Sequence, residues 1–74
     1  MYIEILSLVI EGMICDKCVE KLEKLLTMEP GVVGVSISLA DKRADIRYDE
    51  AKTSARTLCK LIEKAGYDPM IIDQ

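Results

Sequence analysis

The chain has no histidine, no tryptophan and no phenylalanine among its 74 residues, and it has only three cysteines. A closed structural zinc site uses four Cys or His ligands. Three cysteines cannot complete such a site, so it would need a second chain or carboxylate ligands, and we disfavour it. Half of the residues are apolar although tryptophan and phenylalanine are missing, which predicts a globular fold with an aliphatic core.

The chain also lacks an excess of basic charge and any long apolar run. Its net charge is −3 and no basic cluster stands out, which argues against nucleic-acid binding. The longest apolar run, residues 5–10, is interrupted by Ser7 and is too short to insert into a membrane. Residues 1–10 lack the features of a signal peptide, so a complete chain of this sequence is expected to be cytoplasmic, where thiols stay reduced. The length predicts one domain, residues 1–74.

The hydrophobic periodicity predicts four strands and two helices. Alternating apolar residues are typical of strands, and apolar residues at steps of three and four are typical of helices. The helix stops are Pro30-Gly31 and Gly66, and Ser54 is a predicted N-cap. In chain order, the predicted elements are a strand over 3–11, a helix over 16–28, strands over 32–39 and 43–49, a helix over 54–65 and a strand over 70–73.

This order, βαββαβ, predicts an α+β, ferredoxin-like fold. The short polar connection at residues 40–43 makes the second and third strands an antiparallel hairpin. We therefore expect a four-stranded antiparallel sheet with both helices on one face.

The pair Cys15 and Cys18 is the most informative motif. It lies in the predicted loop after the first strand and in the first turn of the following helix. Unpaired N–H groups and the positive end of the helix dipole favour thiolate over thiol there. Two soft sulfur ligands without histidine or clustered carboxylates favour Cu(I), or Hg(II), over harder ions.

A thiol–disulfide oxidoreductase is the alternative from the enzyme class, because a Cys-x-x-Cys pair can also be a redox motif. The pair encloses Asp16-Lys17, with no tryptophan before it and no proline inside it, so we expect a protein that is not an enzyme. The third cysteine, Cys59, falls on the inner face of the second predicted helix. We interpret it as a small core residue.

The run Gly12-Met13-Ile14-Cys15-Asp16-Lys17-Cys18 resembles the Gly-Met-x-Cys-x-x-Cys signature of heavy-metal-associated domains. This family includes small copper chaperones, the N-terminal domains of copper-transporting P-type ATPases and mercury-binding proteins. The resemblance extends over nearly the whole chain. It continues through residues 18–26, 30–32, 45–49 and 63–68.

The resemblance implies specific roles for four residues. Cys15 and Cys18 correspond to the metal ligands, Met13 to a core-packing methionine, and Tyr67 to a loop position close to the metal. Ile14 departs from the family pattern, in which Thr, Ser or His is commoner.

The expected function is that of a Cu(I) chaperone which holds one ion and passes it by ligand exchange to a copper-transporting P-type ATPase or a similar metal-accepting domain. We expect a monomer without metal, with a metal-bridged dimer as the loaded alternative. A mercury(II)-binding role is the second interpretation, because residues 42–53 also resemble mercury-binding members of the family.

Overall fold

The computed structural model describes residues 2–12 and 16–73 and contains the predicted order of elements. These are β1 (Ile3–Glu11), α1 (Asp16–Thr27), β2 (Val32–Ser38), β3 (Arg43–Asp49), α2 (Ala55–Lys64) and β4 (Asp68–Asp73). Most boundaries fall within a residue of the prediction. The exception is β4, which begins two residues early because Asp68 and Pro69 already pair with the end of β1.

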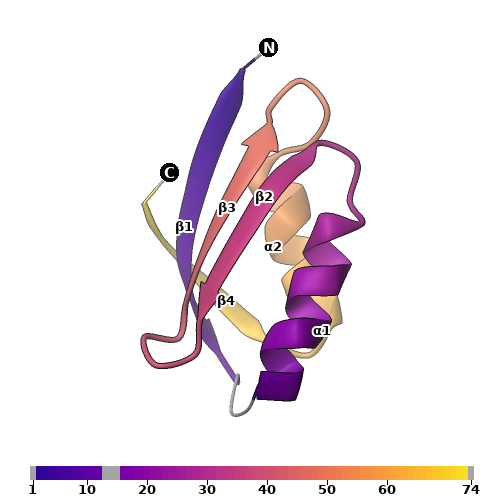
Figure 1. The fold of residues 1–74 in the computed structure, drawn as a ribbon. Coiled ribbons are helices and arrows are strands. Elements are labelled where there is room, and N and C mark those ends of the chain that lie inside the picture. The colour runs from indigo at the N-terminus through magenta and orange to yellow at the C-terminus, as the bar shows by residue number, and fades with distance from the viewer. Residues whose placement is uncertain (1, 13–15, 74) are drawn as a thin grey trace.

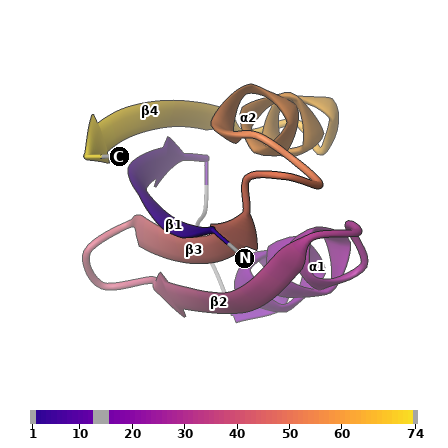
Figure 2. The same ribbon diagram turned by 90° about the horizontal axis from the view of Figure 1, so that it is seen from above.

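The strands form one antiparallel sheet in the order β2-β3-β1-β4. Both helices cover the same face of this sheet, and the other face is left open (Figures 1 and 2). This is the ferredoxin-like fold that the sequence predicts. No helix in the described part of the chain is long and apolar enough to cross a membrane.

The core lies between the sheet and the helices and is aliphatic, as predicted, with one tyrosine. Alternate residues of β1 and β3 meet the inner faces of α1 and α2. The side chains of Leu22 and Leu26 on α1, and of Leu58 and Ile62 on α2, are fully buried. Burying a large aliphatic side chain contributes about 1.5–3 kcal/mol, so this layer holds the helices on the sheet. The buried apolar residues are Leu6, Leu8, Ile10, Leu22, Leu26, Ala44, Ile46, Tyr48, Ala55, Leu58 and Ile62.

Both ends of α2 are capped by local interactions. The Ser54 hydroxyl accepts a hydrogen bond from the backbone N–H of Thr57 at 3.3 Å, which confirms the predicted N-cap. At the other end, Gly66 has a φ of +97°. The N–H groups of Gly66 and Tyr67 donate to the carbonyls of Glu63 and Ile62, which is the Schellman motif. The glycine thus turns the chain back toward the sheet and directs it into β4.

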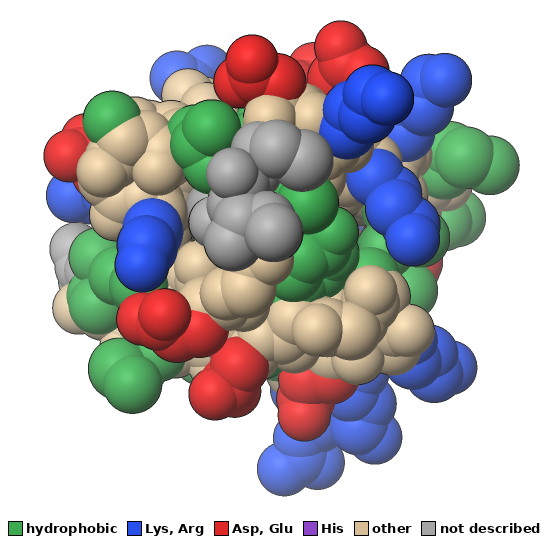
Figure 3. Space-filling model, turned by 90° about the horizontal axis from the view of Figure 1, so that it is seen from below, with side chains coloured by type: hydrophobic (Ala, Val, Ile, Leu, Met, Phe, Trp, Pro, Cys, Tyr) green, Lys and Arg blue, Asp and Glu red, His purple; other side chains and the backbone are tan. Residues whose placement is uncertain are grey.

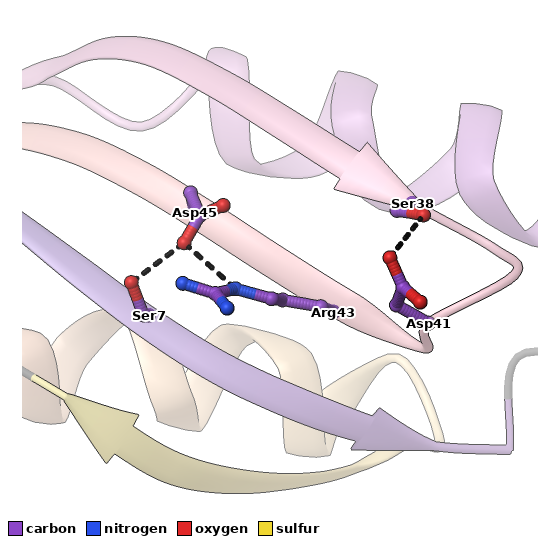
Figure 4. Close-up of polar contacts among 5 residues, drawn as sticks. All are labelled: Ser7, Ser38, Asp41, Arg43 and Asp45. Carbon is purple, nitrogen blue, oxygen red and sulfur yellow. Dashed lines mark hydrogen bonds and ion pairs between the residues drawn. The ribbon is translucent and has the colours of Figure 1, made fainter.

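The open face of the sheet contains a partly buried polar contact that the alternation pattern does not predict. Ser7 points away from the helices, yet it is only 5% exposed. Its hydroxyl donates a 2.6 Å hydrogen bond to the Oδ1 atom of Asp45 on β3, and the Nε atom of Arg43 lies 3.3 Å from the same oxygen (Figure 4). The hydrogen bond from Ser7 is the main cause that lowers the pKa of Asp45 below its ordinary value of 3.8.

Candidate metal centre

Cys18 is the third residue of α1 and is half-buried against the edge of the core. The first turn of a helix leaves backbone N–H groups without helical partners, and these groups favour negative charge. Cys18 therefore lies where a thiolate is electrostatically favoured. The other two expected residues of the motif, Met13 and Cys15, lie outside the described residues.

Gly12 begins the loop between β1 and α1, and its backbone explains the need for glycine. Its φ is +101°, a conformation that residues with a Cβ rarely adopt. A Cβ built there would lie 3.2 Å from the Cδ1 atom of Tyr67. Gly12 therefore ends β1 sharply and allows the ring of Tyr67 to lie against the backbone.

Tyr67 joins two loops that are far apart in the sequence. Its N–H closes the Schellman motif at the end of α2, and its side chain is half-buried against the core. The next residue, Asp68, pairs with Glu11 at the end of β1. The structure therefore places Tyr67 at the end of the sheet where β1 ends, with its ring beside Gly12, the residue that follows β1.

The charged side chains beside this segment are solvent-exposed and of both signs. Asp16, Lys17, Glu20 and Lys21 are all exposed, as expected for a solvated rim. Lys42, in the turn between β2 and β3, lies 3.9 Å from the carboxylate of Glu11. Figure 3 views this end of the molecule and shows acidic and basic side chains around it. This pattern gives no net charge preference to an approaching partner.

The third cysteine, Cys59, lies on a different helix from Cys18 and has different surroundings. It lies on the inner side of α2 and packs against the core, as predicted, but it is half-buried and not one of the fully buried core residues. Burial, assisted by the negative charge of Glu63, raises the pKa of the Cys59 thiol. A thiol that stays protonated is a poor ligand for a soft metal. Among the residues that the structure describes, no three His, Cys, Asp or Glu side chains gather into a metal-binding group.

Comparison with known proteins gives a consistent set of matches. A sequence model of the heavy-metal-associated domain matches residues 7–68. A relative, copper-transporting ATPase 1 of Rhizobium meliloti (strain 1021), is 42% identical over 65 residues, which is 88% of this chain and 8% of the relative.

Two solved structures have the same fold over nearly all of both chains. Oxidized MerP from Ralstonia metallidurans CH34 has a TM-score of 0.91 at 28% identity and covers 97% of this chain and 100% of its own. The CopZ metallochaperone has a TM-score of 0.82 at 30% identity and covers 93% of this chain and 100% of its own.

The copper-transporting ATPases among the relatives are much longer proteins than this chain. The matched region is 8% of the length of copper-transporting ATPase 1 of Rhizobium meliloti (strain 1021), 7% of copper-transporting ATPase 2 of the same organism and 4% of copper-transporting ATPase 1 of Mus musculus. Their transport activity therefore does not carry over to this chain. The family model matches residues 7–68, and the fold is shared with a solved structure at a TM-score of 0.91. The chain therefore belongs to the heavy-metal-associated domain family.

Proposed function

We propose that residues 1–74 act as one Cu(I)-carrying domain in which Cys15 and Cys18 bind a single ion and release it to a partner. The observation that carries this proposal is the position of Cys18, half-buried in the first turn of α1 and three residues after Cys15 in the chain. Membership in a metal-binding family supports it. Copper-transporting ATPases among the relatives favour copper over other soft ions.

The donor set determines how such a site works. Two thiolates give Cu(I) a low coordination number, which leaves room for a third sulfur from an incoming partner. The ion would then move by ligand exchange, through a three-coordinate intermediate, without a redox step or a catalytic residue. Tyr67 would cover one side of the ion, because its ring already lies against Gly12 at the start of the loop.

The proposed partner is a copper-transporting P-type ATPase or a similar metal-accepting domain. Relatives that carry a domain like this chain within a copper-transporting ATPase support this choice. The exchange needs reduced thiols, which places it in a reducing compartment such as the cytoplasm. A second candidate is Hg(II) binding, and the close match to the fold of MerP is the observation that favours it.

A transfer experiment under anaerobic conditions tests the proposal. The Cu(I)-loaded chain would be mixed with the metal-free N-terminal domain of a copper-transporting ATPase, the two proteins separated by ion exchange, and copper measured in each. We expect copper to partition between them within minutes and Cys18→Ser to prevent loading. Copper that stays on this chain, or loading that is unchanged in Cys18→Ser, contradicts the proposal.

The metal that the protein takes up in cells distinguishes copper from mercury as its ion, provided that no metal is added during purification. The protein would be isolated anaerobically from cells grown with copper, with mercury or with zinc, and its metal content measured. Copper at one ion per chain supports the leading proposal. Mercury bound in preference to copper would favour the second candidate.

A further inference from the structure

The open face of the sheet carries a row of alternating charges along β3. Its outward residues are Arg43, Asp45, Arg47 and Asp49, because the intervening Ala44, Ile46 and Tyr48 point into the core. Outward residues of one strand are about 7 Å apart. Positive and negative groups therefore follow each other in the centre of a face that no helix covers (Figure 2).

A shallow groove crosses this face. It is lined by Ile5 and Ser7 of β1, by Asp45 and Arg47 of β3, and by the β2 segment 34–36, with Arg43 at one end. Position 34 faces open space, because a Cβ there would meet no atom within 4 Å. Glycine therefore leaves the groove open where another residue would place a side chain in it. Ile5 is 51% exposed, so the groove combines charge with accessible apolar surface.

The residues that line the groove occupy corresponding positions on the two sides of one row of paired residues. Leu6, Ile46 and Val35 are neighbours across β1, β3 and β2. On one side of this row lie Ile5, Arg47 and Gly34, and on the other side lie the residues two positions along each strand, Ser7, Asp45 and Ser36.

We propose that two copies of the chain associate through this face around a two-fold axis that lies along that row. Such an axis places β3 of one copy antiparallel against β3 of the other. Asp45 then faces Arg47 of the second copy, and Arg43 faces Asp49 of the second copy, and each contact occurs twice. A row of alternating charges is complementary to itself only in this antiparallel arrangement, because a parallel one would put like charges opposite each other.

The groups needed for these contacts are available in the single chain. Ser7 and Arg43 both contact the Oδ1 atom of Asp45, so they hold the carboxylate in place while its Oδ2 atom can accept a second arginine. Arg47 takes part in none of the ion pairs that the described residues form. Facing sheets cross at about 30°, so the pair nearest the axis, Asp45 with Arg47, is the best aligned.

The arrangement has a geometric consequence for the metal centre. The antiparallel axis puts the first turn of α1 in one copy at the opposite end of the dimer from that of the other. The two Cys18 side chains would then be far apart. This dimer is therefore different from a metal-bridged one, which must bring them together, and it differs from the metal-free monomer that the sequence analysis expects.

Sedimentation equilibrium of the metal-free chain, with reductant and a chelator present, tests the proposal. We expect a reversible equilibrium between the 8.3 kDa chain and twice that mass. The association should weaken as salt is added, because exposed charges are screened. A chain that stays monomeric up to about 1 mM, a concentration at which even weak pairs assemble, overturns the proposal.

Charge variants test the two-fold register. Arg47→Glu places two acids opposite each other at both central contacts and should weaken association about tenfold or more. Asp45→Arg should do the same with two bases, and a mixture of the two variants should associate again as a heterodimer. Arg56→Glu makes the same charge change on the exposed surface of α2 and should leave association unchanged. Equal weakening by Arg56→Glu contradicts the proposed face.

Amide NMR shifts locate the interface without any variant, in case Asp45→Arg does not fold. Shifts that change with protein concentration should fall on Ile5, Ser36 and Arg47. Changes confined to α1 and α2, or a dimer that Cys18→Ser abolishes, would show a different interface and overturn the proposal.

Discussion

The substitution Gly12→Ala tests how the chain leaves β1 at the start of the loop that leads to α1. Gly12 has a φ of +101°, and a Cβ there would lie 3.2 Å from the Cδ1 atom of Tyr67. The positive φ would strain the backbone of an alanine, and the 3.2 Å distance is shorter than an ordinary van der Waals contact. The variant should therefore destabilise the fold and move the Tyr67 ring.

The magnitude can be worked out from these two effects. Holding a non-glycine residue in this backbone region costs about 1–3 kcal/mol. The contact with Tyr67 adds less, because the ring needs to move by only a few tenths of an ångström. We expect a total of about 2 kcal/mol, which lowers the melting temperature of a domain this small by roughly 8–16 °C. Urea unfolding of the metal-free protein measures the free energy directly.

Two comparisons separate the backbone effect from the contact. Gly34→Ala is the matched control, because Gly34 does not have a positive φ and a Cβ there meets nothing within 4 Å. It should be nearly neutral. In a Tyr67→Ala background, Gly12→Ala should keep most of its cost, because backbone strain remains after the ring is removed. The reasoning is refuted if Gly12→Ala unfolds at the same urea concentration as the unchanged chain, or if Gly34→Ala is equally destabilising.

Three further predictions concern the core and the open face. Cys59→Ala should leave Cu(I) affinity unchanged and cost roughly 1 kcal/mol in urea unfolding, as small core truncations do; a large loss of affinity would show that this thiol is a ligand. Ile62→Ala should cost about 2–5 kcal/mol because the side chain is fully buried, whereas Met28→Ala, at an 82% exposed position, should change stability by less than about 0.5 kcal/mol. Ser7→Ala should raise the pKa of Asp45 toward 3.8 in a carboxyl NMR titration, because it removes the main hydrogen bond that lowers it. Because the folded-state pKa of Asp45 is lowered, the stability that it contributes is present above pH 3.8 and is lost as the pH falls through the lowered value. The free energy of unfolding of the variant should therefore fall less steeply with pH below pH 4 than that of the unchanged chain.

The order of elements could be predicted from the sequence because each element has its own period and its own stop signal. Leu6, Leu8 and Ile10 alternate on β1 and are all fully buried. Pro30-Gly31 and Gly66 end the two helices where expected. These signals are local, and local signals are what single-sequence patterns record.

Features that depend on contacts between distant residues could not be predicted. The alternation pattern placed Ser7 on the outer face correctly, but its burial depends on Asp45 and Arg43, which are more than thirty residues away. The shift in register between β2 and β3 near Gly34 likewise depends on the pairing of two strands.

The candidate site was predicted in outline. Cys18 lies in the first helical turn, as its spacing indicated. Tyr67 was expected close to the metal from family resemblance, and the structure places it against Gly12. The sequence carries a signal for the turn, Gly66, but none for the direction of the tyrosine ring. The metal-site roles of all four residues, Cys15, Cys18, Met13 and Tyr67, stay predictions, and Cys15 and Met13 lie outside the described part of the chain.

Anaerobic Cu(I) titration against a competing chelator tests the central claim most directly. The unchanged chain and Cys59→Ser should each take up one Cu(I) per chain with the same high affinity. Cys15→Ser and Cys18→Ser should each lose that affinity, while circular dichroism of the metal-free variants stays the same. High-affinity binding of one Cu(I) that survives in the Cys15→Ser, Cys18→Ser double variant would contradict the account.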